Sequence, residues 1–544
     1  MTTTRNNAPS VPAGLPGERQ MRTWAAEFCK EFDAPVQPGI SPGGALPPNA
    51  VTNAGHFLPG GQDFVQMIEE VLRETGTPGR SPFVVPEAEE SFQPVEKTQP
   101  ESVPEPVYSP VVVSSQEAEK GVSGAKTVAQ TAPLASTALI GGIPVDRIRA
   151  DFPILQERLS SGRQLIWFDN GATTQRPRQV IDRLSYYYEH ENSNIHRAAH
   201  ELAARSTDAY EGARATVAKF LGAPGKDNIV FVRGTTEGIN LVARSYVRPR
   251  LKPGDEIILS LLEHHANIVP WQMIAAETGA KIRVIPVDKD GQLLLSEYGK
   301  LFNSRTKFVS VTHVSNVLGT ITPVAELVRI AHGFGVRILI DGAQSVAHLP
   351  VDVTALDPDF YVFSGHKIFA PTGIGALYGK QDALEEAEPY QGGGNMIADV
   401  TFERTVYQPA PGKFEAGTGS IADAVGLGAA LEYLLRIGMP AIAAYEHELT
   451  QYGMNRLATV PGLCLIGTAK EKSGVLSFVL DGHDVSSVGR YLSDHGIAVR
   501  AGHHCAQPIL RHYGLEGSVR PSLALYNTPE EIDVLTDLLK HLAG

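Results

Sequence analysis

The chain has 544 residues and a formal net charge of −13. This length exceeds what one hydrophobic core usually serves, so we expect two or more domains. The acidic balance argues against a nucleic-acid-binding surface, which requires clustered lysine and arginine. No apolar run is long enough to predict a membrane span, and the first residues lack the apolar core of a signal peptide.

Residues 1–140 are dominated by proline, glycine, serine and glutamate, as in Pro42–Pro48 and Ser81–Pro110. Such a composition buries too little apolar surface to offset the entropy of an ordered chain. We therefore expect a disordered, proline-rich extension.

Two short segments of this extension have helical periodicity, at about 18–32 and 63–75. Their apolar residues recur every three or four positions: Met21, Trp24, Phe28 and Phe32 in the first, and Phe64, Ile68 and Val71, with Leu72 beside it, in the second. An isolated helix of this length is marginal in water, so each needs a partner. The partner is either the rest of this chain or a groove on another protein, and the long linker favours the second.

After residue 140 short apolar runs alternate with helical patterns. The expected strands are 228–233, 256–260, 281–285, 307–311, 336–340 and 360–363. This alternation predicts an α/β fold with a mainly parallel sheet covered by helices on both faces. Ligands of such sheets bind at the carboxyl ends of the strands, and nearly all the polar residues below directly follow one of these strands.

The first such loop is Gly234–Asn240, which follows a strand and opens a helix. Backbone N–H groups and the hydroxyls of Thr235 and Thr236 can form an anion site there, reinforced by the helix dipole. The same residues also form an ordinary helix N-cap with an acidic first turn, so this loop alone does not establish a phosphate site.

Two further loops offer groups for a flat, charged cofactor. His264 follows the next strand and can stack on a ring. The alternatives are a structural histidine and a metal ligand. A metal ligand is not favoured, because the histidine pairs do not have zinc-ligand spacing with a cysteine. Asp341 ends another strand, where a carboxylate can pair with a protonated pyridine nitrogen. By itself, Asp341-Gly342 is also a common turn signal.

Lys367 and Cys505 are the most informative residues. Lys367 ends the run Phe363–Lys367 at a strand end, where an unpaired buried lysine is unusual unless it binds a cofactor covalently. Cys505 ends the run Arg500–Cys505, whose arginine and histidines favour a thiolate. An inert buried thiol does not suit this polar loop. Together the two residues suggest pyridoxal phosphate (PLP) chemistry that ends in sulfur transfer.

Cys29 and Cys464 fit packing positions instead. The three cysteines lie far apart and predict no disulfide framework, so a reducing, cytoplasmic setting is expected.

From about residue 143 to the end, the chain resembles the fold-type-I PLP enzymes and, within them, the group II (SufS-like) cysteine desulfurases. The matching runs are Arg233–Asn240, Glu263–Trp271, His313–Asn316, Asp341–Gln344, Ser364–Lys367, Gly392–Gly394, Phe414–Thr418 and Arg500–Cys505. The resemblance implies a large domain at 166–430 with a seven-stranded sheet. It also implies a smaller α+β domain formed by 141–165 and 431–544.

The resemblance also implies a role for each matching residue. Lys367 would carry PLP, Asp341 would pair with its pyridine nitrogen, Gln344 would contact the ring oxygen and His264 would stack on the ring. The phosphate would be held by Thr235, Thr236, Ser364 and His366, and by Thr418 of a neighbouring subunit, which implies a homodimer. Asn316, Arg500 and Arg520 would bind the substrate. No metal site is expected.

The implied reaction converts L-cysteine to L-alanine and leaves a persulfide on Cys505, with Lys367 moving protons. A SufE-like or SufU-like protein would accept the sulfur. An aminotransferase would share Lys367 and Asp341 without needing Cys505, and selenocysteine lyase or cysteine-sulfinate activity can accompany desulfuration. The sequence does not rank these substrates.

The extension at 1–140 is foreign to the catalytic family. In composition it resembles the leaders of cysteine desulfurases packaged as cargo in encapsulin shells. On this reading it docks the enzyme inside a shell in the cytoplasm. The alternative is a regulatory arm that docks on its own catalytic domain.

Overall fold

The computed structural model describes residues 138–195 and 200–544. The expected disordered extension lies outside the described residues except for its last three positions, and so do both helical motifs. The described part opens with a hairpin of β1 (Leu139–Ile140) and β2 (Ile143–Pro144), followed by α3 (Val145–Ala150). Ile140 is fully buried in the main core, so the folded part begins slightly before residue 140.

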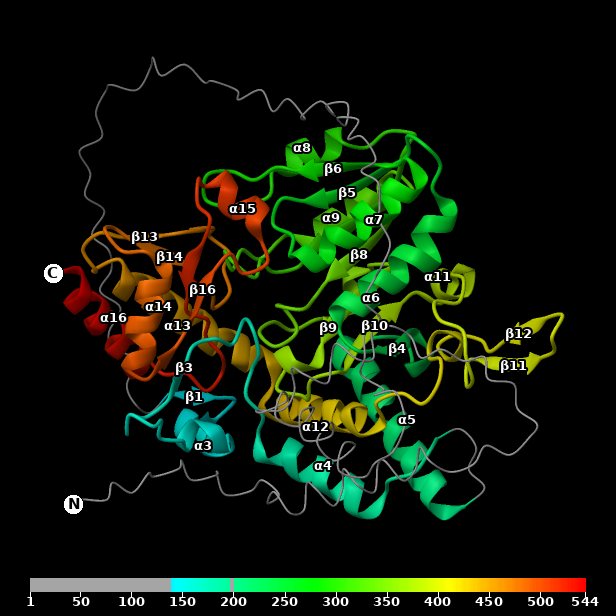
Figure 1. Ribbon diagram of the computed structural model, residues 1–544, viewed down its shortest axis with the longest axis horizontal. Coiled ribbons are helices and arrows are strands. Elements are labelled where there is room, and N and C mark those ends of the chain that lie inside the picture. The colour runs from blue at the N-terminus through cyan, green and yellow to red at the C-terminus, as the bar shows by residue number, and fades with distance from the viewer. Residues whose placement is uncertain (1–137, 196–199) are drawn as a thin grey trace, which may run out of the picture. The chain divides into compact units, whose positions relative to one another are not determined.

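A seven-stranded sheet forms the centre of the larger part (Figure 1). Its order is β4 (Ile229–Val232), β10 (Gly375–Gly379), β9 (Phe360–Ser364), β8 (Arg337–Asp341), β7 (Thr306–Thr312), β5 (Glu256–Ser260) and β6 (Lys281–Ile285). Only β10 runs antiparallel to its neighbours. The mainly parallel sheet expected from the sequence is therefore confirmed, and the six expected strands are all present.

Strand β10 was not anticipated from the sequence, because glycine at both ends weakens its strand signal. The structure shows why glycine is needed there. A Cβ on Gly375 would lie 2.4 Å from the Phe363 carbonyl oxygen and 2.8 Å from the Gly234 Cα. The missing side chain lets β10 approach the loop after β4, which lines the site described below.

Alternate side chains of each strand pack on opposite faces of the sheet, as the two-residue period of a strand requires. Ile229 and Phe231 belong to one hydrophobic core, whereas Val230 and Val232 belong to the other. Helices cover both faces. They are α4 (Arg178–His190), α5 (Glu201–Leu221), α6 (Thr235–Leu241), α7 (Val269–Thr278), α8 (Leu295–Lys300), α9 (Val324–Gly333), α10 (Val353–Leu356), α11 (Gln381–Glu386) and α12 (Ile421–Ile437).

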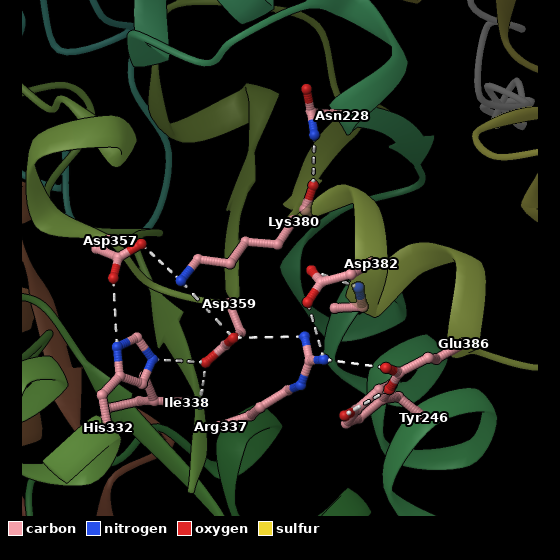
Figure 2. A network of polar contacts seen from close by, with 12 residues as sticks. Asn228, Tyr246, His332, Arg337, Ile338, Asp357, Asp359, Lys380, Asp382 and Glu386 are labelled. Carbon is pink, nitrogen blue, oxygen red and sulfur yellow. Dashed lines mark hydrogen bonds and ion pairs between the residues drawn. The ribbon is translucent and has the colours of Figure 1, made fainter. Parts of the chain in front are cut away.

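A polar network ties down the amino ends of β8 and β9 (Figure 2). The buried Asp359 carboxylate accepts a hydrogen bond from the Ile338 N–H at 2.8 Å and lies 3.0 Å from His332 Nε2. Arg337 reaches Asp382 and Glu386 of α11 at 3.1 and 3.2 Å. These contacts hold the ends of the two strands that lie opposite Asp341 and Lys367.

The C-terminal part forms a four-stranded antiparallel sheet in the order β13 (Leu463–Leu465), β14 (Phe478–Leu480), β17 (Ser518–Arg520) and β16 (Arg500–Gly502). A small parallel pair joins β15 (Ile497–Ala498) to β3 (Ile166–Trp167). The helices of this part are α13 (Met439–Leu457), α14 (Val485–Asp494), α15 (Gln507–His512) and α16 (Pro529–Ala543). In the larger part, β11 (Ile397–Val400) and β12 (Thr405–Tyr407) form a hairpin that projects outward (Figure 1).

Within residues 138–195 and 200–544, no helix on its own has the length and apolar character needed to cross a membrane. Among these described residues, only α12 and α13 taken together have that length and apolar composition, and the chain bends by 77° between the two helices.

Candidate active site

A cavity of about 210 Å³ opens at the carboxyl ends of the parallel strands. It is lined by every residue that the sequence pointed to except Thr418: Thr235, Thr236, His264, Asn316, Asp341, Gln344, Ser364, His366, Lys367, Arg500, Cys505 and Arg520. These residues are spread over almost 300 positions of the chain. They meet because the carboxyl ends of parallel strands share one edge of a sheet.

Lys367 lies in a short 3₁₀ turn, Gly365–Lys367, directly after β9. Burial, opposed in part by the Asp341 carboxylate, lowers the pKa of its amine to about 8. Desolvation disfavours the charged form of a lysine, and this brings its proton exchange close to neutral pH. Lys367 can therefore act both as a nucleophile and as a proton carrier.

Asp341 ends β8 and its side chain is buried. The only hydrogen bond that the described residues give its carboxylate comes from the Ala343 N–H, at 2.9 Å. Burial raises the pKa of this carboxyl, and the nearby Lys367 amine opposes that shift. A buried carboxylate with one hydrogen bond is costly to keep ionised, and a protonated pyridine nitrogen would supply the missing partner.

Ser364 and Thr235 join the end of β9 to the start of α6. The Thr235 N–H donates to Ser364 Oγ at 2.8 Å, and the two hydroxyl oxygens lie 2.9 Å apart. Gly234, with a φ of 154°, allows this contact, because a Cβ there would lie 3.0 Å from Ser364 Oγ. Together with Thr236, these hydroxyls and the start of α6 form a polar cradle suited to a phosphate group.

His264 is held as a neutral imidazole with a defined proton. Its Nδ1 accepts a hydrogen bond from the Ala266 N–H at 3.0 Å, so the proton is on Nε2. Burial, followed by the charge of Lys367, lowers its pKa to about 3. The carboxyl group of the preceding Glu263 anchors this loop, because it accepts hydrogen bonds from Asn267 Nδ2 at 2.6 Å and from the Thr312 N–H at 3.0 Å.

His366 and Gln344 also line the cavity. Burial, with the charges of Lys367 and Arg176, lowers the pKa of His366 to about 4, so its imidazole is neutral. Gln344 Nε2 donates to the Gly171 carbonyl at 2.7 Å. This hydrogen bond orients the Gln344 amide and holds Gly171, in the segment after β3, at the wall of the cavity.

The set of groups therefore fits PLP. The cavity supplies an amine for covalent attachment, a carboxylate short of a partner, a neutral imidazole and a hydroxyl cradle. The carboxylate can pair with the ring nitrogen of that cofactor, the imidazole can stack on the ring face, and the hydroxyl cradle can bind the phosphate.

Cys505 lies in a loop between β16 and α15. His504 and Cys505 both have left-handed backbone conformations, with φ values of 52° and 56°. Such conformations cost free energy in residues other than glycine and persist where the surroundings impose them. The Cys505 N–H donates to His503 Nδ1 at 3.0 Å, and the Cys505 side chain is partly exposed.

Arg520 is almost fully buried and is fixed on two sides. Its Nη1 donates to the Asn316 carbonyl at 2.9 Å, and its Nη2 lies 3.1 Å from Asp169 Oδ1. Arg500 is its cross-strand partner in β16. Arg520 Nε, Asn316 Oδ1 and His504 Nδ1 are buried and have no hydrogen-bond partner among the described residues. Three unpaired polar atoms in contacting, cavity-lining residues suit a small polar ligand.

Two residues of this arrangement were not singled out from the sequence. Asp169 and Gly171 both contact predicted residues. The Asp169-Asn170-Gly171 run reads as an ordinary turn after a strand, and its polar character was the only available signal.

Thr418 lies apart from this cavity. It is exposed on the loop before α12, and its Oγ1 lies 3.3 Å from Asn194 Oδ1. Within one chain it therefore does not join the other predicted cofactor ligands.

Comparison with known proteins agrees with this geometry. Residues 166–535 match the aminotransferase class-V family. A cysteine desulfurase from Synechococcus elongatus is 65% identical over 401 residues, which cover 74% of this chain and 64% of the relative. The chain thus spans less than two thirds of that relative. A cysteine desulfurase from Escherichia coli O127:H6 is 49% identical over 73% of this chain and 98% of the relative.

Among solved structures, the crystal structure of the Escherichia coli cysteine desulfurase CsdA, in an S-sulfonic acid form, superposes with a TM-score of 0.68. It is 40% identical, and the match covers 73% of this chain and 98% of that one.

Proposed function

The chain belongs to the aminotransferase class-V family and to the cysteine desulfurases within it, and on this basis we propose that it converts L-cysteine to L-alanine and retains the sulfur as a persulfide on Cys505. One observation carries the proposal: Lys367, Asp341 and Cys505 line the same cavity. An aminotransferase would use the first two residues and has no need of the third.

PLP, when bound, supplies an electron sink that stabilises negative charge on the substrate carbons. In this chain Lys367 would attach it, Asp341 would face its ring nitrogen, and His264 and Gln344 would contact its ring. Thr235, Thr236, Ser364 and His366 would hold its phosphate. The neutral state of both histidines follows from their lowered pKa values.

The substrate carboxylate would bind Arg520 and Asn316, with Arg500 at the exposed edge. Asp169 and the Asn316 carbonyl hold two sides of the Arg520 guanidinium, so the cation is oriented before the substrate arrives. A fixed guanidinium is well suited to carboxylate recognition, since little freedom is lost on binding. The lowered pKa of Lys367 lets its amine move protons at the substrate carbons near neutral pH.

Sulfur transfer would then occur at Cys505. Its thiolate attacks the substrate sulfur, a sulfur–sulfur bond forms, and the carbon–sulfur bond breaks. The electron pair of the broken bond goes to the carbon side, which takes up a proton and becomes the methyl group of alanine. The persulfide on the partly exposed Cys505 can pass to an acceptor, for which a SufE-like or SufU-like protein is our proposal.

The decisive experiment supplies L-cysteine to the PLP-loaded enzyme and measures both products. We expect alanine and, by mass spectrometry of digested protein, one added sulfur on the Cys505 peptide. Formation of an oxo acid without a Cys505 persulfide would identify an aminotransferase instead. Selenocysteine in the same assay ranks the two substrates.

The enzyme would act as a homodimer, because Thr418 is remote from its own cavity and would complete the phosphate site of a second copy. Residues 1–140 would direct it into an encapsulin shell in the cytoplasm. The support for this part is the proline-rich composition with two apolar helical motifs. The competing role is an arm that docks on the same enzyme.

A further inference from the structure

The turn Asn316–Gly319, here named the clamped turn, follows β7 and carries Asn316 into the cavity. Its four consecutive carbonyl groups each accept a hydrogen bond from a different donor. Arg520 Nη1 binds the Asn316 carbonyl, Ser477 Oγ binds that of Val317, Lys472 Nζ binds that of Leu318, and the Ser473 N–H binds that of Gly319. Every carbonyl of this turn is engaged by a partner distant in sequence, so the turn is held from outside.

All four donors belong to the C-terminal part of the chain. Ser477 directly precedes β14 and Arg520 ends β17, and these strands pair at Phe478 and Val519. The packing is close: a Cβ on Gly467 would lie 2.7 Å from the Leu318 Cβ. The small sheet therefore sets the position of a turn that belongs to the larger part, and with it the position of Asn316 relative to Arg520.

Lys472 is the unusual member of this set. Its side chain is 3% exposed, and within residues 138–195 and 200–544 no acidic group pairs with it. Burial of an unpaired amine is costly, and lysines are almost never fully buried without a partner. A methionine would fill the same space at lower cost for folding. What a methionine cannot do is donate a hydrogen bond to the Leu318 carbonyl.

We propose that Lys472 is a positioning residue for substrate recognition. By holding the Leu318 carbonyl it sets the clamped turn, and so it presents the Asn316 amide beside Arg520 where the carboxylate of an amino-acid substrate binds. This rests on the proposed function in that it names a further residue for carboxylate recognition at the same cavity.

The test compares Lys472→Met with Tyr298→Phe in the full-length, PLP-loaded enzyme. Tyr298 is a matched control, because its buried hydroxyl also donates to a backbone carbonyl, that of Leu327, at 3.1 Å and outside the cavity. Three quantities are measured: kcat and KM with L-cysteine, and the dissociation constant of L-alanine by calorimetry. L-Alanine carries the carboxylate but no sulfur.

We expect Lys472→Met to raise both KM and the dissociation constant about tenfold, with kcat within about threefold of wild type, since a binding group has lost its alignment. Tyr298→Phe should leave all three unchanged. A Lys472→Met enzyme whose KM and dissociation constant match wild type would overturn the proposal.

If Lys472→Met does not fold, Ser477→Ala decides the question, because it removes the donor to the neighbouring Val317 carbonyl. It should raise both constants in the same direction, and unchanged constants would count against the clamp. If the wild-type enzyme makes no alanine from cysteine, the proposed function fails, yet the L-alanine measurement still tests Lys472.

Discussion

The backbone N–H of His265 donates a hydrogen bond to the carbonyl of Cys505, with an N···O distance of 2.8 Å. The rings of His265 and His503 also stack, with centroids 5.9 Å apart. These contacts join the loop after β5, which carries His264, to the loop that carries Cys505. A thiol on a surface loop is thereby fixed over a cavity built mainly from the ends of a distant sheet.

Lys367→Ala should abolish turnover and the yellow, borohydride-reducible form of the protein, because no other described lysine lines the cavity. Absorption spectra and mass spectrometry of the borohydride-treated protein check this. A cofactor adduct retained on another residue would contradict the assignment of Lys367.

Cys505→Ala should still bind PLP and L-cysteine yet form almost no alanine, because the bond to the substrate sulfur cannot form. The packing position expected for Cys464 is wrong, because this residue is exposed on the edge strand β13. Cys464→Ala is the control, since this exposed thiol does not line the cavity, and it should retain full activity. Persulfide found on Cys464 with Cys505 unmodified would refute the role of Cys505.

Asp169→Asn should raise the KM for cysteine about five- to tenfold with little change in kcat, because the charge that orients Arg520 is lost. Steady-state kinetics measure the effect. Glu326→Gln removes an exposed ion pair with Arg329, and such pairs contribute little, so this control should behave as wild type. Equal kinetics for both variants would show that Asp169 does not orient Arg520.

Stability should depend on pH through Lys472. Burial lowers the pKa of its amine from 10.5 to about 7. Below pH 7 both folded and unfolded chains bind the proton, and the cost of burying the charge is fully present. Between pH 7 and 10.5 the unfolded chain binds more protons, so stability rises with pH. Lys472→Met removes this contribution, so the stability advantage of the variant over wild type should shrink by roughly 3 kcal/mol between pH 6.5 and pH 9.5.

Urea denaturation at pH 6.5 and pH 9.5 measures that change for wild type and variant. Tyr298→Phe, which changes no group that titrates in this range in the folded chain, should follow the wild-type dependence. Parallel pH dependences for wild type and Lys472→Met would show that the buried amine does not titrate as described.

Deleting residues 1–137 should leave folding and desulfurase activity intact, because the described core begins with β1. The cut stops before Leu139, since Ile140 is buried. The same deletion should abolish co-purification with a co-expressed encapsulin shell protein. Trp24→Ala with Phe28→Ala should weaken capture strongly, since each buried aromatic anchor commonly contributes about 2 kcal/mol. Capture of the truncated enzyme would exclude the shell-docking role.

Much of the site was predictable from sequence because its chemistry is local to strand ends. Apolar runs predict β4, β5, β8 and β9, and the polar residues that follow them must meet at one edge of a parallel sheet. Lys367, Asp341 and Thr235 could therefore be assigned to one cavity before any coordinates were known. The particular roles of these residues came from resemblance to a family.

Other features were decided only by tertiary packing. Asp169 meets Arg520 and Lys472 meets Leu318 across more than 150 residues of chain, and neither contact has a periodic signal. A lysine in a polar loop reads as a solvated side chain, and a strand flanked by glycines such as β10 reads as a turn. Local sequence determines which elements form and what chemistry their ends carry. Which distant groups orient that chemistry depends on close packing between elements, because burial and hydrogen-bond partners are properties of the assembled fold.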